Sequence, residues 1–389
     1  MARSLKIAFV GSRGIPAKYG GAETFAEEVS QKLTKLGFEV YVTCESHKFH
    51  RDEYNGVIRI HTPSIQGKTL TVPTVNDILS TFHLLLRCPG IKLIYYASPD
   101  AALAALIPRL LRKKVIVNTD GIEWKRLVIR RQYFSPGWKF LSVLVSWYLK
   151  LMERLAVKVS QAVIADSREI KAYLEESYKA KNVVYVSYGA RELLNSNIST
   201  EREDEILKGF GLSPGGYYLT VGRVVAENNF HKEIEGFKRC GSDKEIVIVG
   251  NFNEKDRYTS YLFKLRNNNP RIKFLNPVYD KEVLGILRKN CYAYIHAYEV
   301  GGTNPSLLEQ MLFRRPILAY DVPFHREVLQ GGGIYFGNEE LAKSIEMLEN
   351  RGIDLKETGE WQVKRIEEEY NWDNVAEKYN SLFRELLED

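Results

Sequence analysis

Short apolar runs alternate with helix-length segments through the first half of the chain. The first run, residues 7–11, is followed by a glycine-rich loop and then by apolar side chains at helical spacing, Phe25, Val29, Leu33 and Leu36. Further runs lie at residues 38–43, 92–97, 114–118, 162–166 and 183–186. Strands that alternate with helices in this way pair in parallel, so the pattern predicts a parallel sheet covered by helices on both faces.

A polar stretch at residues 191–208 interrupts the alternation, which then starts again. The second series has apolar runs at residues 217–221, 245–249, 272–275, 292–296 and 316–320. We therefore predict an α/β fold with two doubly wound, Rossmann-like domains, residues 1–190 and 191–371, whose strand ends face a central cleft. Residues 372–389 predict an amphipathic C-terminal helix that packs on another element.

Composition narrows the class of protein. With 389 residues, 44% of them hydrophobic and 27% charged, the chain resembles an ordinary globular protein. The formal charge of +6 comes from scattered basic residues, so we expect no nucleic acid partner. Cys44, Cys88, Cys240 and Cys291 lie far apart without metal-ligand spacing. We expect a cytoplasmic location, no export signal and no membrane-spanning segment.

Residues 11–23 (GSRGIPAKYGGAE) form a glycine-rich loop directly after the first predicted strand. Glycines such as Gly20 and Gly21 let the backbone approach a ligand closely, and the helix that follows offers N–H groups to a phosphate. Arg13 or Lys18 would add positive charge. The spacing matches neither the dinucleotide fingerprint nor the P-loop. A glycine-rich turn without a ligand explains the loop equally well.

A second candidate loop, residues 118–126, also follows a predicted strand. Asp120 would lie at the carboxyl end of that strand, where it is our candidate to accept a proton from a substrate hydroxyl group. The neighbouring Glu123 would raise the pKa of Asp120. The alternative is that Asp120 caps the segment that follows it.

In the second domain, Arg223 follows the first predicted strand of the series. Its planar guanidinium would clamp a diphosphate through paired hydrogen bonds, and it would lie in the cleft opposite the glycine-rich loop of the first domain. A surface arginine paired with Glu227 is the alternative.

Residues 296–309 (HAYEVGGTNPSLLE) hold the densest pattern. Gly301 and Gly302 would expose backbone N–H groups, and Pro305 suits the first turn of a helix whose N-terminus would cradle a diphosphate. Glu309, one turn inside this helix, would accept hydrogen bonds from a ribose diol. A buried structural glutamate is the alternative.

Two further features leave their roles open. Asp120, Glu299 and His325 are candidate acids or bases, although neither a catalytic triad nor a paired-carboxylate spacing can be read from the chain. Basic residues at positions 125–131 precede an apolar helix, residues 140–157, with several aromatic side chains. That helix fits an anionic membrane surface, and a core helix is the alternative.

Together these segments resemble the retaining glycosyltransferases of family 4, which have the GT-B fold, and most closely their rhamnosyltransferase-like branch. The resemblance covers nearly the whole chain, and its motifs occur in the family's order. They are GSRGIP at 11–16, YGGAETF at 19–25, DGIEWKR at 120–126, ADS at 165–167, YGA at 188–190, VGR at 221–223, ENN at 227–229 and GGTNPSLLE at 301–309.

The resemblance implies a nucleoside diphosphate sugar donor, often dTDP-L-rhamnose, held mainly by the second domain. It implies a saccharide or polyprenyl-linked saccharide acceptor, for a cell-surface polysaccharide, on the first domain. No cofactor and no divalent metal are implied, and the last helix would cross back onto the first domain. Arg223 would hold the diphosphate and Glu309 the ribose. The donor-binding set is Gly20, Gly21, Arg223, Asn228, Glu299, Gly301, Gly302, Thr303, Asn304 and Glu309. The acceptor-side set is Arg13, Glu123, Trp124, Lys125 and Arg126.

Two positions depart from the wider family. Its two glutamates are usually eight residues apart, and eight residues before Glu309 the chain has Gly301, with Glu299 two residues earlier. The usual lysine after the diphosphate arginine is absent from residues 227–229, which read ENN. Both departures are shared by the rhamnosyltransferase-like branch, which is why the chain resembles that branch.

Retaining transfer passes through an oxocarbenium-like transition state in which the diphosphate leaves. We expect Arg223, the backbone of residues 301–303 and the following helix N-terminus to stabilise that departing charge. The acceptor proton would go to the leaving phosphate or to Asp120. Two rival hypotheses are a nucleotide-sugar epimerase of the same architecture and a non-catalytic subunit of a polysaccharide assembly complex.

Overall fold

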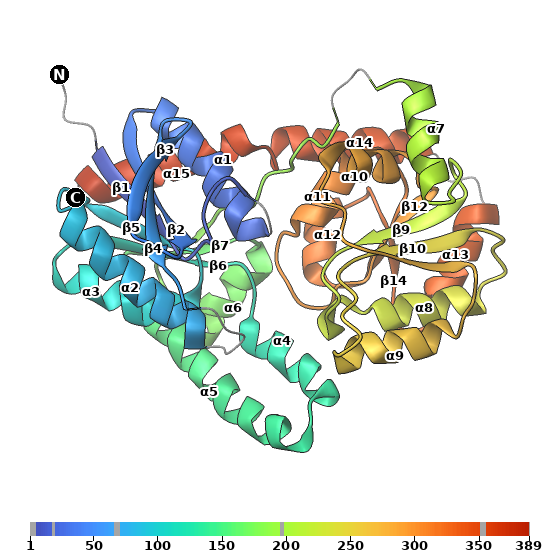
Figure 1. The fold of residues 1–389 in the computed structure, drawn as a ribbon, viewed down its shortest axis with the longest axis horizontal. Helices are drawn as coiled ribbons and strands as arrows, with labels where there is room; N and C mark the ends of the chain where they lie inside the picture. Colours follow the sequence, from blue (N-terminus) through green and yellow to red (C-terminus); the bar gives the residue numbers. More distant parts are fainter. Residues whose placement is uncertain (1–4, 18–19, 66–70, 195–197, 351–354, 389) are drawn as a thin grey trace. The chain divides into compact units, whose positions relative to one another are not determined.

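The computed structural model describes residues 5–17, 20–65, 71–194, 198–350 and 355–388 (Figure 1). The chain divides into two compact units. The first comprises residues 1–124, 140–189 and 371–389, and the second comprises residues 125–139 and 190–370. Residues 125–139 thus belong with the second unit, whereas the sequence pattern assigned them to the first.

An eight-stranded sheet forms the centre of the first unit, in the order β3-β4-β2-β1-β5-β6-β7-β8. Neighbouring strands pair in parallel, except that β3 runs antiparallel to β4. The strands are β1 (Leu5–Val10), β2 (Phe38–Ser46), β3 (His50–Tyr54), β4 (Val57–Pro63), β5 (Leu93–Tyr96), β6 (Lys114–Thr119), β7 (Ala162–Ala165) and β8 (Val183–Tyr185).

Alternating side chains of this sheet build two separate cores. Ala8, Val10 and Tyr96 point to one face, in a cluster that includes α2 (Thr71–Arg87), α3 (Ala102–Leu110) and α5 (Pro136–Val159). Because successive residues of a strand point to opposite faces, Phe9 and Tyr95 point to the other face. There they meet α1 (Gly21–Lys35) and α15 (Trp372–Glu388). The remaining helices α4 (Glu123–Arg130) and α6 (Arg168–Tyr178) follow β6 and β7.

The last helix, α15, belongs to the first unit although it follows the second along the chain. Its aromatic side chains interlock with those of α1 and the sheet. Tyr379 lies 5.2 Å from Phe25 between ring centroids, and Phe383 lies 6.3 Å from Phe9. Gly189 passes so close to Trp372 that a Cβ atom on this glycine would lie 2.6 Å from the indole ring. The helix is therefore part of this unit's core.

The second unit has a six-stranded, wholly parallel sheet in the order β11-β10-β9-β12-β13-β14. Its strands are β9 (Tyr217–Val221), β10 (Glu245–Val249), β11 (Ile272–Leu275), β12 (Ala293–His296), β13 (Ile317–Tyr320) and β14 (Ile334–Phe336). Its helices are α7 (Thr200–Gly209), α8 (Phe230–Arg239), α9 (Arg257–Arg266), α10 (Lys281–Asn290), α11 (Pro305–Met311), α12 (Pro323–Leu329), α13 (Leu341–Asn350) and α14 (Leu355–Glu368).

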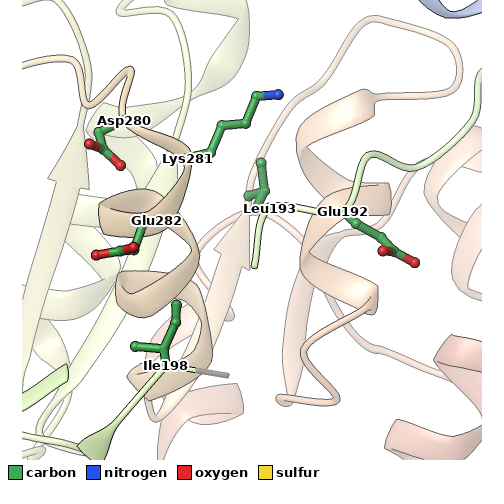
Figure 2. A pocket seen from close by; sticks show the side chains of 6 residues that line it. All are labelled: Glu192, Leu193, Ile198, Asp280, Lys281 and Glu282. Carbon is green, nitrogen blue, oxygen red and sulfur yellow. The ribbon is translucent and has the colours of Figure 1, made fainter. Parts of the chain in front are cut away.

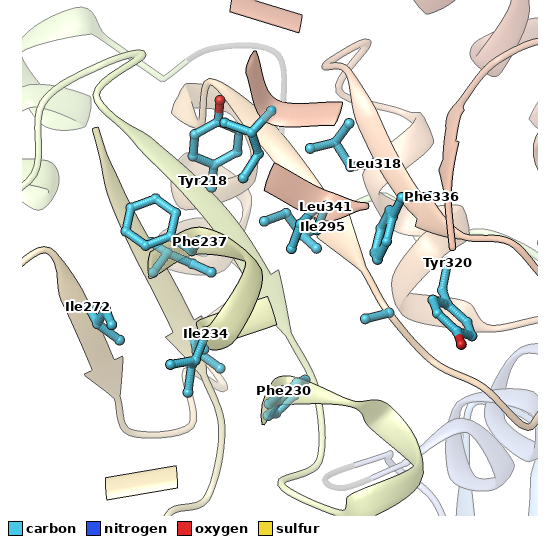
Figure 3. Close-up of a cluster of buried hydrophobic side chains, with 14 of the residues drawn as sticks. Tyr218, Phe230, Ile234, Phe237, Ile272, Ile295, Leu318, Tyr320, Phe336 and Leu341 are labelled. Atoms are coloured by element: carbon cyan, nitrogen blue, oxygen red, sulfur yellow. The ribbon is translucent and has the colours of Figure 1, made fainter. Parts of the chain in front are cut away.

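One core cluster of this unit lies between the sheet and helices α8, α9 and α13. Figure 3 shows Phe230, Ile234 and Phe237 of α8 among the side chains of the strands. Residues 125–139 pack against the same cluster through Ile129 and Tyr133. The Tyr133 ring lies 4.8 Å from that of Tyr258, which explains why this segment groups with the second unit.

The α/β class with two doubly wound parallel sheets is confirmed. None of the described helices has the length and hydropathy needed to cross a bilayer.

Candidate functional site

In doubly wound sheets, ligands bind beyond the carboxyl ends of the strands, so the loops that follow β9, β12 and β13 are the candidate ligand-binding loops of the second unit. Arg223 lies in the loop after β9 with its side chain exposed. Among the described residues, its guanidinium has no hydrogen-bond or ion-pair partner. Its carbonyl oxygen accepts a hydrogen bond from Asn228 Nδ2 at 2.8 Å, which fixes the loop.

Glu227 is not the partner of Arg223. Its buried carboxylate accepts hydrogen bonds from Arg130, with the Nε atom 3.0 and 2.9 Å from the two oxygens. The surface pair that we considered as the alternative for Arg223 is therefore absent, since Arg130 has taken that carboxylate. The guanidinium of Arg223 remains available at the edge of the sheet.

Glu299 lies in the loop after β12 and is held by two groups from the start of α8. Its Oε2 atom is 3.1 Å from both Asn229 Nδ2 and Lys232 Nζ. Burial acts to raise the pKa of Glu299, but these hydrogen bonds and the Lys232 charge outweigh it and lower the pKa. Lys232 also donates to Tyr320 Oη at 3.1 Å. A lysine therefore does lie beside these loops, three residues beyond the segment 227–229 that lacks one.

The glycines of these loops allow close packing. A Cβ atom on Gly222 would lie 1.7 Å from the hydroxyl of Tyr298, so no larger residue fits there without rearrangement. A Cβ atom on Gly301 would lie 4.0 Å from Arg126, which places a second guanidinium near the loop of residues 301–303. Gly302 and Thr303 are buried beside it.

Helix α11 positions Glu309. Asn304 caps the helix, since its Oδ1 atom accepts a hydrogen bond from the Ser306 amide at 2.9 Å. Glu309 Oε2 accepts a hydrogen bond from Arg288 Nη2 at 3.1 Å, while Arg288 also bonds the carbonyl and hydroxyl oxygens of Ser306. Burial raises the pKa of Glu309, although Arg288 opposes the shift. The Glu309 side chain is 17% exposed, and within the described residues its Oε1 atom has no partner.

Two buried histidines stand beside this loop. His296 ends β12 and has no hydrogen bond to either ring nitrogen among the residues described, and its ring centroid lies 4.8 Å from that of His325. His325 Nδ1 is 2.7 Å from the Tyr320 carbonyl oxygen. Burial lowers the pKa of His296 well below its usual value and that of His325 to about 4. Both rings are therefore neutral at physiological pH.

In the first unit, carboxylates occupy the glycine-rich loop. Glu23 Oε1 accepts a hydrogen bond from the Arg13 amide at 3.3 Å, and Glu27 Oε2 accepts one from the Ala17 amide at 2.9 Å. A Cβ atom on Gly20, the residue before α1, would lie 2.9 Å from Glu23 Oε2. These negative charges disfavour a phosphate at the start of α1, where Gly20 and Gly21 lie. Lys18 lies outside the described residues.

The predicted acceptor-side residues are divided between the two units. Asp120 follows β6, and Glu123 begins α4. Trp124 donates from Nε1 to Tyr173 Oη at 2.9 Å and carries Lys150 above its ring at 4.0 Å. Arg13, Glu123 and Trp124 fall in the first unit, and Lys125 and Arg126, which follow Trp124 directly along the chain, fall in the second.

Two other features of the described residues carry polar or metal-ligating side chains. Of the described residues, His50, Asp52 and His61 form the single group with ligand atoms close enough for a metal ion, but Asp52 already accepts two 2.7 Å bonds from Arg59. A polar pocket (Figure 2) is lined by Glu192, Leu193, Ile198, Asp280, Lys281 and Glu282. None of the predicted site residues lines that pocket.

Comparisons with known proteins match the two halves of the chain to different family models. Residues 204–372 match the model of the family described as glycosyl transferases group 1. We call residues 204–372 the group 1 domain. The group 1 domain contains Arg223, Glu299 and Glu309, whereas residues 5–191 match a domain of unknown function, DUF1972. Among curated protein sequences, none matches the chain.

Solved structures share the fold of the whole chain, including its group 1 domain. Sucrose-phosphate synthase from Thermosynechococcus elongatus has a TM-score of 0.80 at 15% identity, covering 98% of this chain and 99% of that one. HepE of Anabaena in complex with UDP-glucose has a TM-score of 0.70 at 16% identity, covering 98% and 100%. The catalytic domain of starch synthase IV from Arabidopsis thaliana, bound to ADP and acarbose, has a TM-score of 0.68 at 12% identity, covering 100% of both chains. The predicted GT-B fold is confirmed.

Proposed function

We propose that the protein is a glycosyltransferase that takes its sugar from a nucleoside diphosphate sugar bound at the carboxyl edge of the group 1 domain. The observation that carries this proposal is Arg223, an exposed guanidinium without a protein partner among the described residues, at the end of β9. A cation in that position suits a diphosphate, because the charge on the leaving group grows during transfer. The complexes of HepE with UDP and with UDP-glucose support the same ligand class.

The other donor contacts follow from the geometry of the loops. Glu309 is fixed through Oε2 by Arg288, which leaves Oε1 for the diol of a ribose. Residues 301–303 and Arg126 would line the diphosphate. Helix α11 has only seven residues and Asn304 already caps it, so we assign the charge stabilisation to Arg223 and the loop backbone rather than to this helix terminus.

Finer assignments rest on the sequence resemblance. We propose a hexosyl donor, dTDP-L-rhamnose in the first instance, transferred with retention to a saccharide or a polyprenyl-linked saccharide. This reaction would take place at a membrane surface during the synthesis of a cell-surface polysaccharide. The acceptor would lie on the first unit, near Arg13, Asp120 and Glu123. The acceptor proton would pass to the leaving phosphate or to Asp120, and no metal ion would be required.

The test measures turnover of a panel of nucleotide sugars with a saccharide acceptor. Arg223→Ala should lower turnover by about 100-fold or more, since removing one donor to developing charge has effects of that size. Arg223→Lys should restore part of it. Arg239→Ala is the matched control, because Arg239 is also exposed but lies at the far end of α8, beyond the opposite edge of the sheet.

Three results would contradict the proposal. An Arg223→Ala enzyme as active as its parent would remove the assigned diphosphate contact. An isomerised sugar formed from donor alone would indicate an epimerase. Binding of nucleotide sugars without turnover of any acceptor would indicate a non-catalytic subunit.

A further inference from the structure

Helices α2 and α5 of the first unit each carry an exposed apolar stripe. On α2 the stripe is Val75, Leu79, Phe82 and Leu86, and on α5 it is Phe140, Leu144, Trp147 and Leu151. Both follow the spacing i, i+4, i+7, i+11, which places the four side chains on one side of a helix. Phe140 and Trp147 are 73% and 72% exposed. A helix of a globular protein normally turns such a stripe inward.

The stripes belong to one face of the unit. Helices α2, α3 and α5 contribute to the same core cluster on one side of the sheet, and Thr74 Oγ1 of α2 lies 3.1 Å from Tyr148 Oη of α5. Leu103 and Leu110 of α3 add two more exposed side chains. We call this surface the apolar face, made of Val75, Leu79, Phe82, Leu86, Leu103, Leu110, Phe140, Leu144, Trp147 and Leu151. Single exposed apolar residues are ordinary, but a collected surface of this kind marks an interaction site.

The charges around the apolar face have one sign. In α2, α3 and residues 140–159 of α5, the acidic residues are Asp77 and Glu153, and both are buried. The exposed charged side chains of the same segments are all basic: Arg87, Arg109, Lys150, Arg154 and Lys158. Arg154 and Lys158 continue the α5 stripe at helical spacing. A partner for this surface must therefore be both apolar and negatively charged.

We propose that the apolar face is a docking surface for an anionic lipid bilayer. Apolar stripes would enter the boundary between head groups and acyl chains, and the basic side chains would meet the anionic head groups. Trp147 has the apolar body and polar N–H group suited to that boundary. The described helices are too short or too polar to span the bilayer, so the contact lies in the plane of the membrane.

The biological reason for docking rests on the proposed function, but the docking itself does not. A polyprenyl-linked acceptor is confined to a membrane, so an enzyme that docks there meets the acceptor in two dimensions. Lipid binding itself needs neither donor nor acceptor. It can therefore be tested separately from sugar transfer.

The test is a vesicle flotation assay of the full chain, without any sugar present. Vesicles of phosphatidylcholine with about one third phosphatidylglycerol should bind the protein, and vesicles of pure phosphatidylcholine should bind it at least about tenfold more weakly, because several basic side chains contribute. The double variant Leu144→Ser, Trp147→Ser should weaken binding to the anionic vesicles by about tenfold or more. Arg154→Gln with Lys158→Gln should weaken it severalfold and reduce its sensitivity to salt.

Tyr279→Ser is the matched control, because Tyr279 is 68% exposed but lies in the second unit. It should leave vesicle binding unchanged. All of these side chains are exposed, so the variants should keep the parental melting temperature. Hydrolysis of a nucleotide sugar in water should also be unchanged in every variant. If that activity is missing from the parent, the proposed function fails while the lipid result stands.

Three results would overturn the docking proposal. They are failure of the parent to bind anionic vesicles, equal binding to neutral vesicles, and undiminished binding by the Leu144→Ser, Trp147→Ser variant. A different outcome would assign the surface to a second copy of the chain. In that case the parent would not bind vesicles, and sedimentation would show dimers that the Leu144→Ser, Trp147→Ser variant no longer forms.

Discussion

Three glutamates of the second unit each form an ion pair with a basic side chain of another segment. Arg130 binds Glu227, Lys232 binds Glu299, and Arg288 binds Glu309. The sequence pattern placed Glu299 in the loop after a predicted strand and Glu309 one turn inside the helix that follows, as the structure does. It could not identify their partners, because local periodicity does not tell which helix side chains will lie above a loop. Arg223 was predictable because it directly follows β9.

A buried carboxyl group of the first unit should make stability depend on pH. Burial, with the neighbouring charges of Asp100 and Glu45, raises the pKa of Asp77 to about 8. In the unfolded chain Asp77 has its ordinary pKa of 3.8. Between pH 3.8 and about 8, the carboxyl group is therefore protonated in the folded state and ionised in the unfolded state. The contribution of protonated Asp77 to the free energy of unfolding is therefore complete below pH 3.8 and is lost as the pH rises through about 8.

Asp77→Asn removes this titration, so the variant should gain stability relative to the parent as pH rises from about 4 to about 8. Urea unfolding of both proteins at several pH values measures the difference. Asp243→Asn is the control, because Asp243 is almost fully exposed and should show no such trend. A difference between Asp77→Asn and the parent that stays constant with pH would contradict the assignment.

At the scale of elements, buried strands were easier to predict than exposed ones. The expected bounds of β9, β10 and β11 coincide with the structure, because each is a short apolar run between polar segments. The hairpin of β3 and β4 was missed, since its residues are largely polar and partly exposed. Asn55-Gly56, both with positive φ, was the available signal. Strand β14, which has only three residues and directly follows the glycines at 331–333, was also missed.

Helix α15 should be required for the stability of the first unit. Phe383 is fully buried against Phe9, Phe38 and Tyr379. Phe383→Ala would leave a cavity that these side chains cannot fill, at a cost of about 3–5 kcal/mol. Calorimetry should show the unfolding transition of the first unit shifted to lower temperature. Ser381→Ala, on the exposed side of the same helix, is the control and should leave that transition in place. An unchanged transition in Phe383→Ala would show that the helix is not part of the core.

At the scale of the whole molecule, the chain builds two compact units and passes between them four times. The alternation of strands and helices predicted both sheets, and the motifs of the resemblance predicted the GT-B fold. The placement of residues 125–139 was not predictable, because this short segment reads as a continuation of the first unit. Only its contacts show otherwise, through Ile129, Arg130 and Tyr133.

Two units, of which only the second has the proposed ligand-binding loops, should respond differently to a nucleoside diphosphate. A ligand that binds only the folded state adds about 2.7 kcal/mol at a concentration 100 times its Kd, which is several degrees in melting temperature for a unit of this size. We expect UDP or dTDP to raise the transition of the second unit and to leave that of the first in place. The shift should persist in EDTA, because Arg223 rather than a metal ion would hold the diphosphate. Arg223→Ala should reduce the shift, and Arg239→Ala should not. If EDTA abolished the shift in the parent, a cation bound between protein and diphosphate would have to replace Arg223 as the main source of positive charge.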